Sequence, residues 1–348
     1  MLLPQSNLTE RRHDALAHDM VQPPHPNLAE GWTARLLAKA VVAVALLCAT
    51  GTSLVRAGTL YLPNASFESP VVPFDLTPAF PDMDYWQKTP QPGWYDPAQH
   101  GYYPWDTSMG TFYNFPYPSS FIDNCDGSQA SFLFAYPDVA IFQDYDTIYG
   151  ANTTPSHAFN AKFNVNRAYR FTVGVIGGVN GAPPLYLGAT LQLSLYYRDA
   201  ASNMVTVAAT TITNSAQLFP TNTHFVDFSV DVPGVLTTAP WAGKNIGVQI
   251  ASTVGFDKAN GYWDLDNVRL TETALPVVTN PRMTNSQFGF SLLSQPGQQF
   301  EMLASTNLSL PISNWTSLGI LTNVTGTAAF SDPATNFTGR FYQARQLQ

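Results

Sequence analysis

The stretch GYWDLDNVRL, residues 261–270, decides how this chain is interpreted. Most of its residues favour a β-strand, but Asp264 and Asp266 interrupt them two positions apart. Side chains alternate between the two faces of a strand, so both acids are expected on the same face as Val268 and Leu270. If that face is turned toward a core, two carboxylates lie inside the core or at its rim.

Two other arrangements of this strand are compatible with the same sequence. In the first, Trp263 and Leu265 are the inward pair, which leaves both acids in water. In the second, a β-bulge near Asn267 switches the face of the strand between Asp266 and Val268. The choice matters because an unpaired carboxylate inside a sandwich costs on the order of several kcal/mol, whereas a bound cation turns that cost into binding energy.

The sequence around this strand indicates a series of short strands. Between residues 168 and 273, β-branched or alternating runs are separated by turn clusters such as GGVNGAPP, DAASN and FPTNT. This spacing predicts an antiparallel β-sandwich. Residues 58–167 are predicted to belong to the same unit, with TLYLPNASFES as the opening strand. A long loop region crowded with Pro and aromatic residues, roughly 74–120, lies within it, and such loops commonly serve binding.

A second module is predicted after the segment TALPVVTNP. The runs FGFSLLSQ, FEMLAST, WTSLGILT, GTAAFSD and RFYQARQ indicate short strands in the remaining residues. We therefore expect a small sandwich of the immunoglobulin or fibronectin type at 274–348, joined by a Pro-containing linker. The fold class predicted for the whole chain is all-β.

The first residues, 1–57, differ from the rest of the chain. Basic residues precede the apolar run AVVAVALLCATGTSLV, and Val55 and Ala57 occupy small-residue cleavage positions. The run is shorter than the ~20 residues that a transmembrane helix needs. We predict a signal peptide that is cleaved after Ala57, export of a bacterial protein to the cell surface or medium, and no transmembrane span in the mature chain.

Charge and cysteine content exclude several classes of partner and site. The formal net charge is −8, which disfavours binding to nucleic acid and to anionic membranes. Only Cys125 remains once the leader is removed, so the mature chain can form neither an intramolecular disulfide nor a thiolate metal site. Between residues 58 and 150 there are eleven acids and a single Lys or Arg, Lys88. Carboxylates are hard oxygen ligands, so this excess favours Ca²⁺ over zinc or copper.

Two short motifs resemble a known family. NASFES (64–69) and DLDNVRL (264–270), in this order, resemble the galactose-binding-like jelly rolls that occur as carbohydrate-binding modules. The resemblance spans 58–273 and implies that the first and last strands lie side by side and hold a structural calcium ion. Transferred by position, Glu68 and Asp266 match the calcium ligands, with Asp264 as a further candidate.

The C-terminal part carries a separate resemblance. EMLASTNLSLPISNWTSLG, followed by GTAAFSDP and RFYQAR, is similar to a small module at the end of secreted proteins from Verrucomicrobia-like bacteria. That resemblance implies no activity. Calcium-dependent cyclases of cyanobacterial indole-alkaloid pathways are similar to the first jelly roll, so the fold is compatible with catalysis.

The loop DMDYWQKTPQPGWYDPAQHGYYPWDT, residues 82–107, supplies the candidate ligand-binding residues. Aromatic faces stack on the apolar faces of sugar rings, and nearby Asp, Asn and Gln bond sugar hydroxyls. Trp94 and Trp105, each close to an Asp, are the preferred platforms. The further candidates are Trp86, Tyr95 and Tyr102. Some of these rings are expected to fill the open end of the sandwich instead.

These observations predict an exported, non-catalytic protein that binds an extracellular polysaccharide or glycan and holds a structural calcium. The alternatives are a jelly-roll enzyme, either a calcium-dependent lyase or cyclase or a glycosidase, and a structural cell-surface protein. The mature chain lacks the G-x-S-x-G motif of a nucleophile elbow, and no residue is assigned a catalytic role.

Overall fold

The computed structural model describes residues 58–72, 81–99, 103–116, 121–149, 154–177, 184–333 and 339–347. The predicted leader and the candidate residue Tyr102 lie outside the described residues. No helix in the described ranges is long and apolar enough to cross a membrane.

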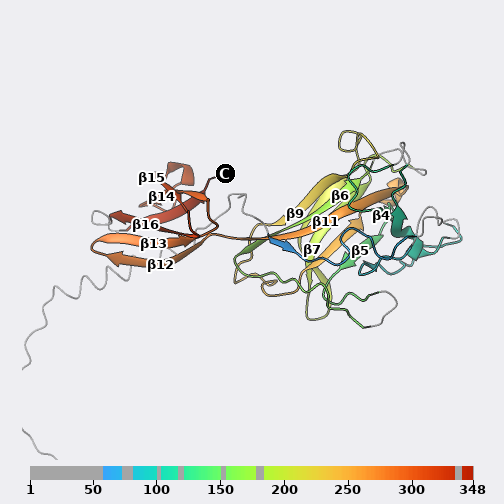
Figure 1. The fold of residues 1–348 in the computed structure, drawn as a ribbon, viewed down its shortest axis with the longest axis horizontal. Helices are drawn as coiled ribbons and strands as arrows, with labels where there is room; N and C mark the ends of the chain where they lie inside the picture. The colour runs from blue at the N-terminus through green and yellow to red at the C-terminus, as the bar shows by residue number, and fades with distance from the viewer. Residues whose placement is uncertain are drawn as a thin grey trace, which may run out of the picture. The chain divides into compact units, whose positions relative to one another are not determined.

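The first module is a sandwich of two antiparallel sheets (Figure 1). In the described residues one sheet has the order β3-β4-β11-β6-β9, with β1 paired to β11, and the other has the order β2-β5-β10-β7-β8. The first sheet consists of β1 (Gly58–Leu60), β3 (Met109–Tyr113), β4 (Gln129–Phe134), β6 (Arg167–Ile176), β9 (Val226–Val232) and β11 (Tyr262–Ala274). The second consists of β2 (Gln87–Lys88), β5 (Ala140–Gln143), β7 (Thr190–Arg198), β8 (Met204–Thr213) and β10 (Gly247–Ser252). From β4 to β7, and again from β8 to β11, each strand lies in the opposite sheet from its predecessor, as in a jelly roll.

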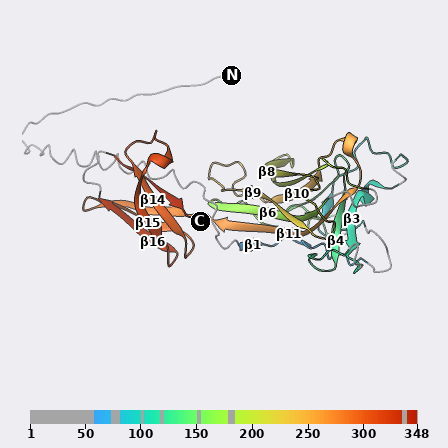
Figure 2. The ribbon, with the colours of Figure 1, turned by 90° about the horizontal axis from the view of Figure 1, so that it is seen from above.

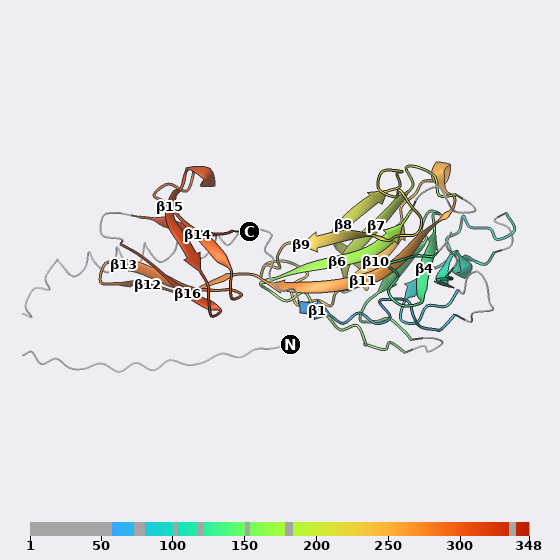
Figure 3. The same cartoon turned by 45° about the horizontal axis from the view of Figure 1, so that its top comes forward.

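The first and last strands of this module are neighbours. β1 pairs antiparallel with β11 (Figure 3). In this register Leu60 lies opposite Leu270. The N–H of Val268 also donates to the carbonyl of Ala65, 3.2 Å away. The side-by-side arrangement that the family resemblance implied is therefore confirmed.

A β-bulge at Asn267 determines where the two acids of β11 point. The register of β11 against β6 shifts between Asp266 and Arg269, and Asn267 has a φ of 54°. Trp263 and Leu265 belong to the buried core between the sheets, and so do Val268 and Leu270 beyond the bulge. Asp264 and Asp266 consequently face away from that core.

The expectation that Asp266 shares a face with Val268 is therefore wrong, because the extra residue of the bulge reverses the alternation. The alternative that leaves both acids in water fails for Asp266. Its side chain is fully buried on the outer face of the sheet. A small apolar cluster that includes Ile122, Ala130, Ile176 and Phe225 forms separately from the main core.

The C-terminal module is a second, smaller sandwich (Figure 2). Its described strands form two three-stranded sheets, in the orders β12-β13-β16 and β15-β14-β17. They are β12 (Val277–Thr284), β13 (Gln287–Leu293), β14 (Gln299–Ser305), β15 (Thr316–Thr322), β16 (Thr327–Pro333) and β17 (Phe341–Gln346). Phe288, Phe290, Phe300 and Tyr342 build the core between the two sheets. The predicted all-β fold of two successive sandwiches is confirmed, while the resemblance of this module to Verrucomicrobia-like proteins stays a prediction.

Candidate functional site

Glu68 and Asp266 hold the same turn, which connects β3 to β4. Oε1 of Glu68 accepts hydrogen bonds from the backbone N–H groups of Ser128, at 2.9 Å, and Gln129, at 2.7 Å. Oδ2 of Asp266 accepts the backbone N–H of Asp126 at 2.6 Å. We call Glu68, Asp266 and the turn 125–129 the acidic clamp.

Gly127 allows the turn to approach Glu68 this closely. Its φ of +100° lies in a region that residues with a side chain rarely adopt. A Cβ placed on Gly127 would lie 2.6 Å from Oε1 of Glu68 and 2.6 Å from its carboxyl carbon. The clamp therefore needs a glycine at this position for two independent reasons.

Burial makes the Asp266 carboxyl an unusual acid. Desolvation raises the pKa of Asp266 to about 7, against the opposing effect of its hydrogen bond from the N–H of Asp126. The backbone N–H of Asn267 and the thiol of Cys125 also lower the pKa of Asp266, while its second oxygen, Oδ1, makes no hydrogen bond of good geometry within the described residues. Desolvation and the neighbouring Asp266 also raise the pKa of the Cys125 thiol, which keeps this thiol protonated and poorly nucleophilic.

Asp264 lies two residues away but does not join the clamp. It sits on the outer face of the sheet between Phe132 on β4 and Ile176 on β6. Within the described residues its partly buried carboxyl has no hydrogen bond or ion pair. Desolvation raises the pKa of Asp264 to about 7.

The acidic clamp partly fits a divalent cation. The unpaired Oδ1 of Asp266 is the kind of hard, desolvated oxygen that Ca²⁺ binds. In the described part of the chain, however, no three Asp, Glu, His or Cys side chains gather as a metal centre. A cation at the clamp would therefore rest on the two carboxylates together with backbone carbonyl oxygens. Calcium stays a prediction.

Three of the aromatic residues predicted to bind a ligand are buried. Trp86, Tyr95 and Trp105 each expose 5% of their surface and belong to the main core. The indole of Trp86 stacks on Phe67 with ring centroids 5.3 Å apart, and the indole N–H of Trp105 donates to the carbonyl of Thr89. These three rings stabilise the loop region and offer no open face.

Trp94 lies where the loop meets the second sheet. Its partly buried indole makes an edge contact with Trp105, at a centroid distance of 5.9 Å, and another with Phe256, at 4.9 Å. Its N–H donates to Oδ2 of Asp138 at 2.9 Å. Phe256 belongs to the short 3-10 helix η2 (Phe256–Lys258) and is 66% exposed. Trp94 thus links an exposed aromatic ring to a fixed carboxylate.

Asp138 forms part of a groove of about 510 Å³ on the outward face of the second sheet. Gln249 and Ala251 alternate along β10 with the buried Val248 and Ile250, so they point outward into the groove. The groove is lined by Thr89, Pro90, Gln91, Pro92, Asp138, Ala140, Gln249, Ala251, Ser252 and Thr253. Among the described residues, the buried Oγ of Ser252 has no hydrogen-bond partner. The lining combines small apolar residues with amide, hydroxyl and carboxylate groups.

Sequence reasoning missed Asp138, Gln249 and Phe256. Gln249 left a signal, because in GVQIAS it is the polar position between two apolar residues and so faces outward. Asp138 and Phe256 left none, since Asp138 lies in a turn before β5 and Phe256 in the short helix η2 after β10. Only the folded chain brings them beside Trp94.

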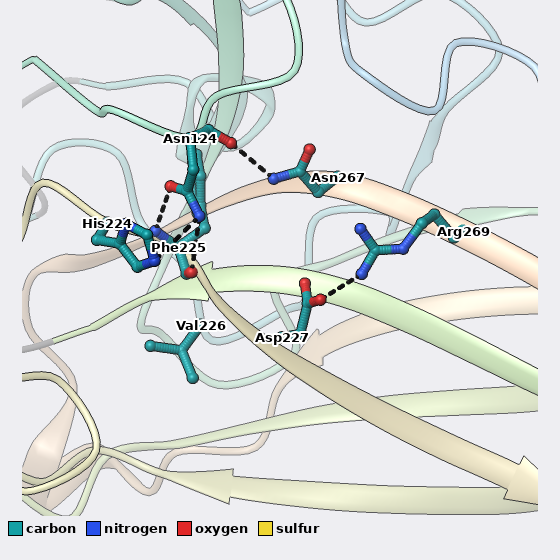
Figure 4. Close-up of a pocket in the computed structure, with 7 residues that line it drawn as sticks. All are labelled: Asn124, His224, Phe225, Val226, Asp227, Asn267 and Arg269. Atoms are coloured by element: carbon teal, nitrogen blue, oxygen red, sulfur yellow. Dashed lines mark hydrogen bonds and ion pairs between the residues drawn. The ribbon is translucent and has the colours of Figure 1, made fainter.

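A second depression, of about 430 Å³, lies on the outward face of the first sheet (Figure 4). Its polar groups largely bond one another. Nδ2 of Asn267 donates to the carbonyl of Asn124 at 2.9 Å, and Arg269 forms an ion pair with Asp227 at 2.5 Å (Figure 4). None of the predicted site residues lines this depression.

The sequence matches no protein-family model and no curated protein. Among solved structures, a cyclase from Fischerella sp. TAU is 20% identical, with a TM-score of 0.43, over 63% of this chain and 98% of that chain. The CBM22-1–CBM22-2 tandem domain of Paenibacillus barcinonensis Xyn10C is 10% identical, with a TM-score of 0.32, over 87% and 93% of the two chains. The CBM22-1–GH10 modules of Clostridium thermocellum xylanase 10B, solved with xylohexaose, are 14% identical, with a TM-score of 0.29, over 56% and 28%. None of these values assigns a function to this chain.

Proposed function

We propose that the sandwich of residues 58–273 is a non-catalytic module that binds extracellular carbohydrate in the groove on its second sheet. One observation carries this proposal. Trp94 joins the exposed ring of Phe256 to the carboxylate of Asp138, which lines the groove. Export by the predicted leader would bring the module to its ligand.

The groove supplies the polar contacts that a sugar needs, and Phe256, which does not line the groove but packs on Trp94, supplies an exposed ring. The C–H face of a pyranose packs on an aromatic ring, which Phe256 exposes at 66%. Sugar hydroxyls donate to a carboxylate such as Asp138, and they exchange hydrogen bonds with the amides of Gln91 and Gln249. A pocket with a few polar groups among apolar ones is typical of small-molecule sites.

The acidic clamp is proposed to stabilise this module by binding Ca²⁺. Oδ1 of Asp266 and the carboxylate of Glu68 would supply protein oxygens, and the bound ion would fix the turn 125–129 against the first and last strands. The ion has no role in contacting sugar in this proposal, because the clamp belongs to the first sheet and the groove to the second.

A glycan array, probed with the full chain in calcium and again in EDTA, tests the function. Binding to a defined set of polysaccharides is expected, and the Phe256→Ala variant should lose most of it. Phe121→Ala is the matched control, since Phe121 is also exposed (43%) but lies in the connection between β3 and β4 of the first sheet. Equal binding by both variants, or no binding to any glycan, would refute the proposal.

A jelly-roll enzyme is the second candidate, and Asp264 is the observation that favours it. A carboxyl whose pKa is raised to about 7 suits a general acid at neutral pH. Asp264 lines neither the groove on the second sheet nor the depression on the first, which is why binding is the preferred function. If the wild-type chain turned over a glycan and Asp264→Asn abolished this turnover, an enzyme would become the preferred function.

A further inference from the structure

We propose that the groove selects uncharged polysaccharides and rejects those that carry uronate or sulfate groups. This inference rests on the proposed function of the groove and adds the chemical class of its ligand. It follows from which charges face the groove and from how the nearby cations are already bonded.

Asp138 is the only charged residue among those described that line the groove. The other polar lining groups are the amides of Gln91 and Gln249 and the hydroxyls of Thr89, Ser252 and Thr253. Neutral amides and hydroxyls bond sugar hydroxyls without preference for charge. A ligand carboxylate or sulfate would therefore meet one negative charge and no compensating positive one.

Asp138 is held in place. Its φ is 65°, its Oδ2 accepts the indole N–H of Trp94 at 2.9 Å, and its carbonyl accepts the hydroxyl of Thr89 at 2.7 Å. Because the backbone of Asp138 and one oxygen of its carboxylate are both held, the negative charge stays at the groove when an anion approaches. Its Oδ1 would accept a ligand hydroxyl, whereas an ionised ligand group has no proton to donate.

The cations on the same sheet are bonded elsewhere. Among the described residues, the strands of the second sheet carry two cationic side chains, Lys88 on β2 and Arg198 on β7. Nζ of Lys88 donates to the carbonyls of Pro81 and Asp106. Arg198 donates to the carboxylate of Asp144 at 2.7 Å and to the carbonyl of Ser202 at 2.8 Å.

The cation closest in sequence to Phe256 is also engaged. Nζ of Lys258 donates to the carbonyl of Leu187 at 3.3 Å. Moving Lys88 or Arg198 toward a ligand anion would break hydrogen bonds to the carbonyls of Pro81 and Asp106 or to the buried carboxylate of Asp144, which costs free energy. The chain as a whole adds to the repulsion, with a formal net charge of −8.

The experiment measures binding of the full chain to pairs of polymers that share a backbone and differ in charge. Suitable pairs are unsubstituted xylan with glucuronoxylan, methyl-esterified with de-esterified homogalacturonan, and β-glucan with its C6-carboxylated form. Each is immobilised at equal sugar density and titrated at low and at physiological salt. The neutral member of any pair that binds is expected to bind about fivefold to tenfold more tightly, as one partly screened charge pair predicts, and added salt should narrow the gap.

Variants assign the effect to Asp138. Asp138→Asn should reduce the preference for the neutral member to less than twofold, and Asp138→Lys should reverse it. Asp146→Asn is the matched control, because Asp146 is exposed and does not line the groove. Circular dichroism confirms that each variant is folded before it is titrated.

The outcomes separate the two levels of the proposal. If no polymer of any pair binds, the proposed function is wrong. If the acidic member of a pair binds as tightly as the neutral one, or more tightly, the groove still binds glycan but the charge selection is refuted. If the preference persists unchanged in Asp138→Asn, Asp138 is not its source, and the inference is equally overturned.

Discussion

Glu68 follows the first strand of the sandwich and Asp266 lies in the last, yet their carboxylates accept hydrogen bonds from the same turn, at residues 126–129. Three segments that are remote in sequence are thereby tied together at one place. Hydrogen bonds to a charged acceptor contribute more than neutral ones, so the clamp should be visible in the stability of the module.

Replacing Glu68 by Ala is expected to lower the free energy of unfolding by about 2–3 kcal/mol. The substitution leaves the N–H groups of Ser128 and Gln129 without their acceptor and removes a packed side chain. Urea unfolding monitored by tryptophan fluorescence measures this loss. Asp146→Ala is the control, and its cost should stay within about 0.5 kcal/mol because the side chain is exposed. Equal costs for the two variants would show that the clamp contributes nothing.

Gly127→Ala should lower the free energy of unfolding of the module by more than the cost of placing Ala at a positive φ. Gly243 has a φ of +75° and no atom within 4 Å of a built Cβ, so Gly243→Ala isolates the cost of a positive φ, about 1–2 kcal/mol. Gly127→Ala adds a clash with the Glu68 carboxyl at 2.6 Å. The double variant Gly127→Ala/Glu68→Ala should recover part of that excess, and a strictly additive double variant would contradict the contact.

Calcium is expected to raise the melting temperature of the wild-type chain, and EDTA to lower it again. The stabilisation follows mass action, about 2.7 kcal/mol at a calcium concentration one hundred times Kd. Asp266→Asn, which retains the shape of the side chain, should lose this response. Magnesium is the control ion, since it prefers a smaller, octahedral site. An identical melting temperature in calcium and in EDTA would leave the clamp as a set of hydrogen bonds without a metal.

Asp264 predicts how the stability of the metal-free chain depends on pH. Its pKa is about 7 in the folded chain and near 3.8 when unfolded, so between these values the folded state binds more protons. Stability should therefore decrease as pH rises from 4 through 7, by on the order of 1–3 kcal/mol. Asp264→Asn should make this part of the profile less steep, and the remaining decrease is expected from Asp266, whose pKa is also raised to about 7. If the free energy of unfolding of the wild-type chain in EDTA increased over the same pH range, the Asp264 carboxyl would be ionised in the folded chain.

The bulge in β11 could have been predicted from the sequence, although strict alternation of side chains does not include it. Its apolar residues occupy odd positions at Trp263 and Leu265 and even positions at Val268 and Leu270. A change of phase in an alternating pattern is what a bulge produces, and Asn tolerates the positive φ that Asn267 adopts. The pairing of β1 with β11 could also be predicted from the sequence, because the family resemblance of the motifs at the two ends of the module implied it.

The groove could not be predicted from the sequence in the same way. Its parts come from the loop after β2, from β5 and from β10, and only long-range strand pairing brings them together. Composition predicted that the loop 82–107 is rich in rings but not which rings are buried. Trp105 and Trp94 are both flanked by turns, yet Trp105 lies in the core while Trp94 borders the groove. Tertiary packing, which local sequence does not specify, separates the two.

Trp94→Phe tests whether this border position serves ligand binding. Phe retains a ring to pack against Phe256 but removes the indole N–H that fixes Asp138. This bond is also present in the free chain, so its loss should lower the melting temperature slightly. Asp138 is then less well oriented, which should weaken binding to a neutral polysaccharide by about threefold to tenfold. Trp315→Phe is the matched control, because it removes an indole bond to the carbonyl of Leu310 in the C-terminal module. Isothermal titration of both variants decides the matter, and a loss of affinity in Trp315→Phe as large as that in Trp94→Phe would mean that the effect does not arise in the groove.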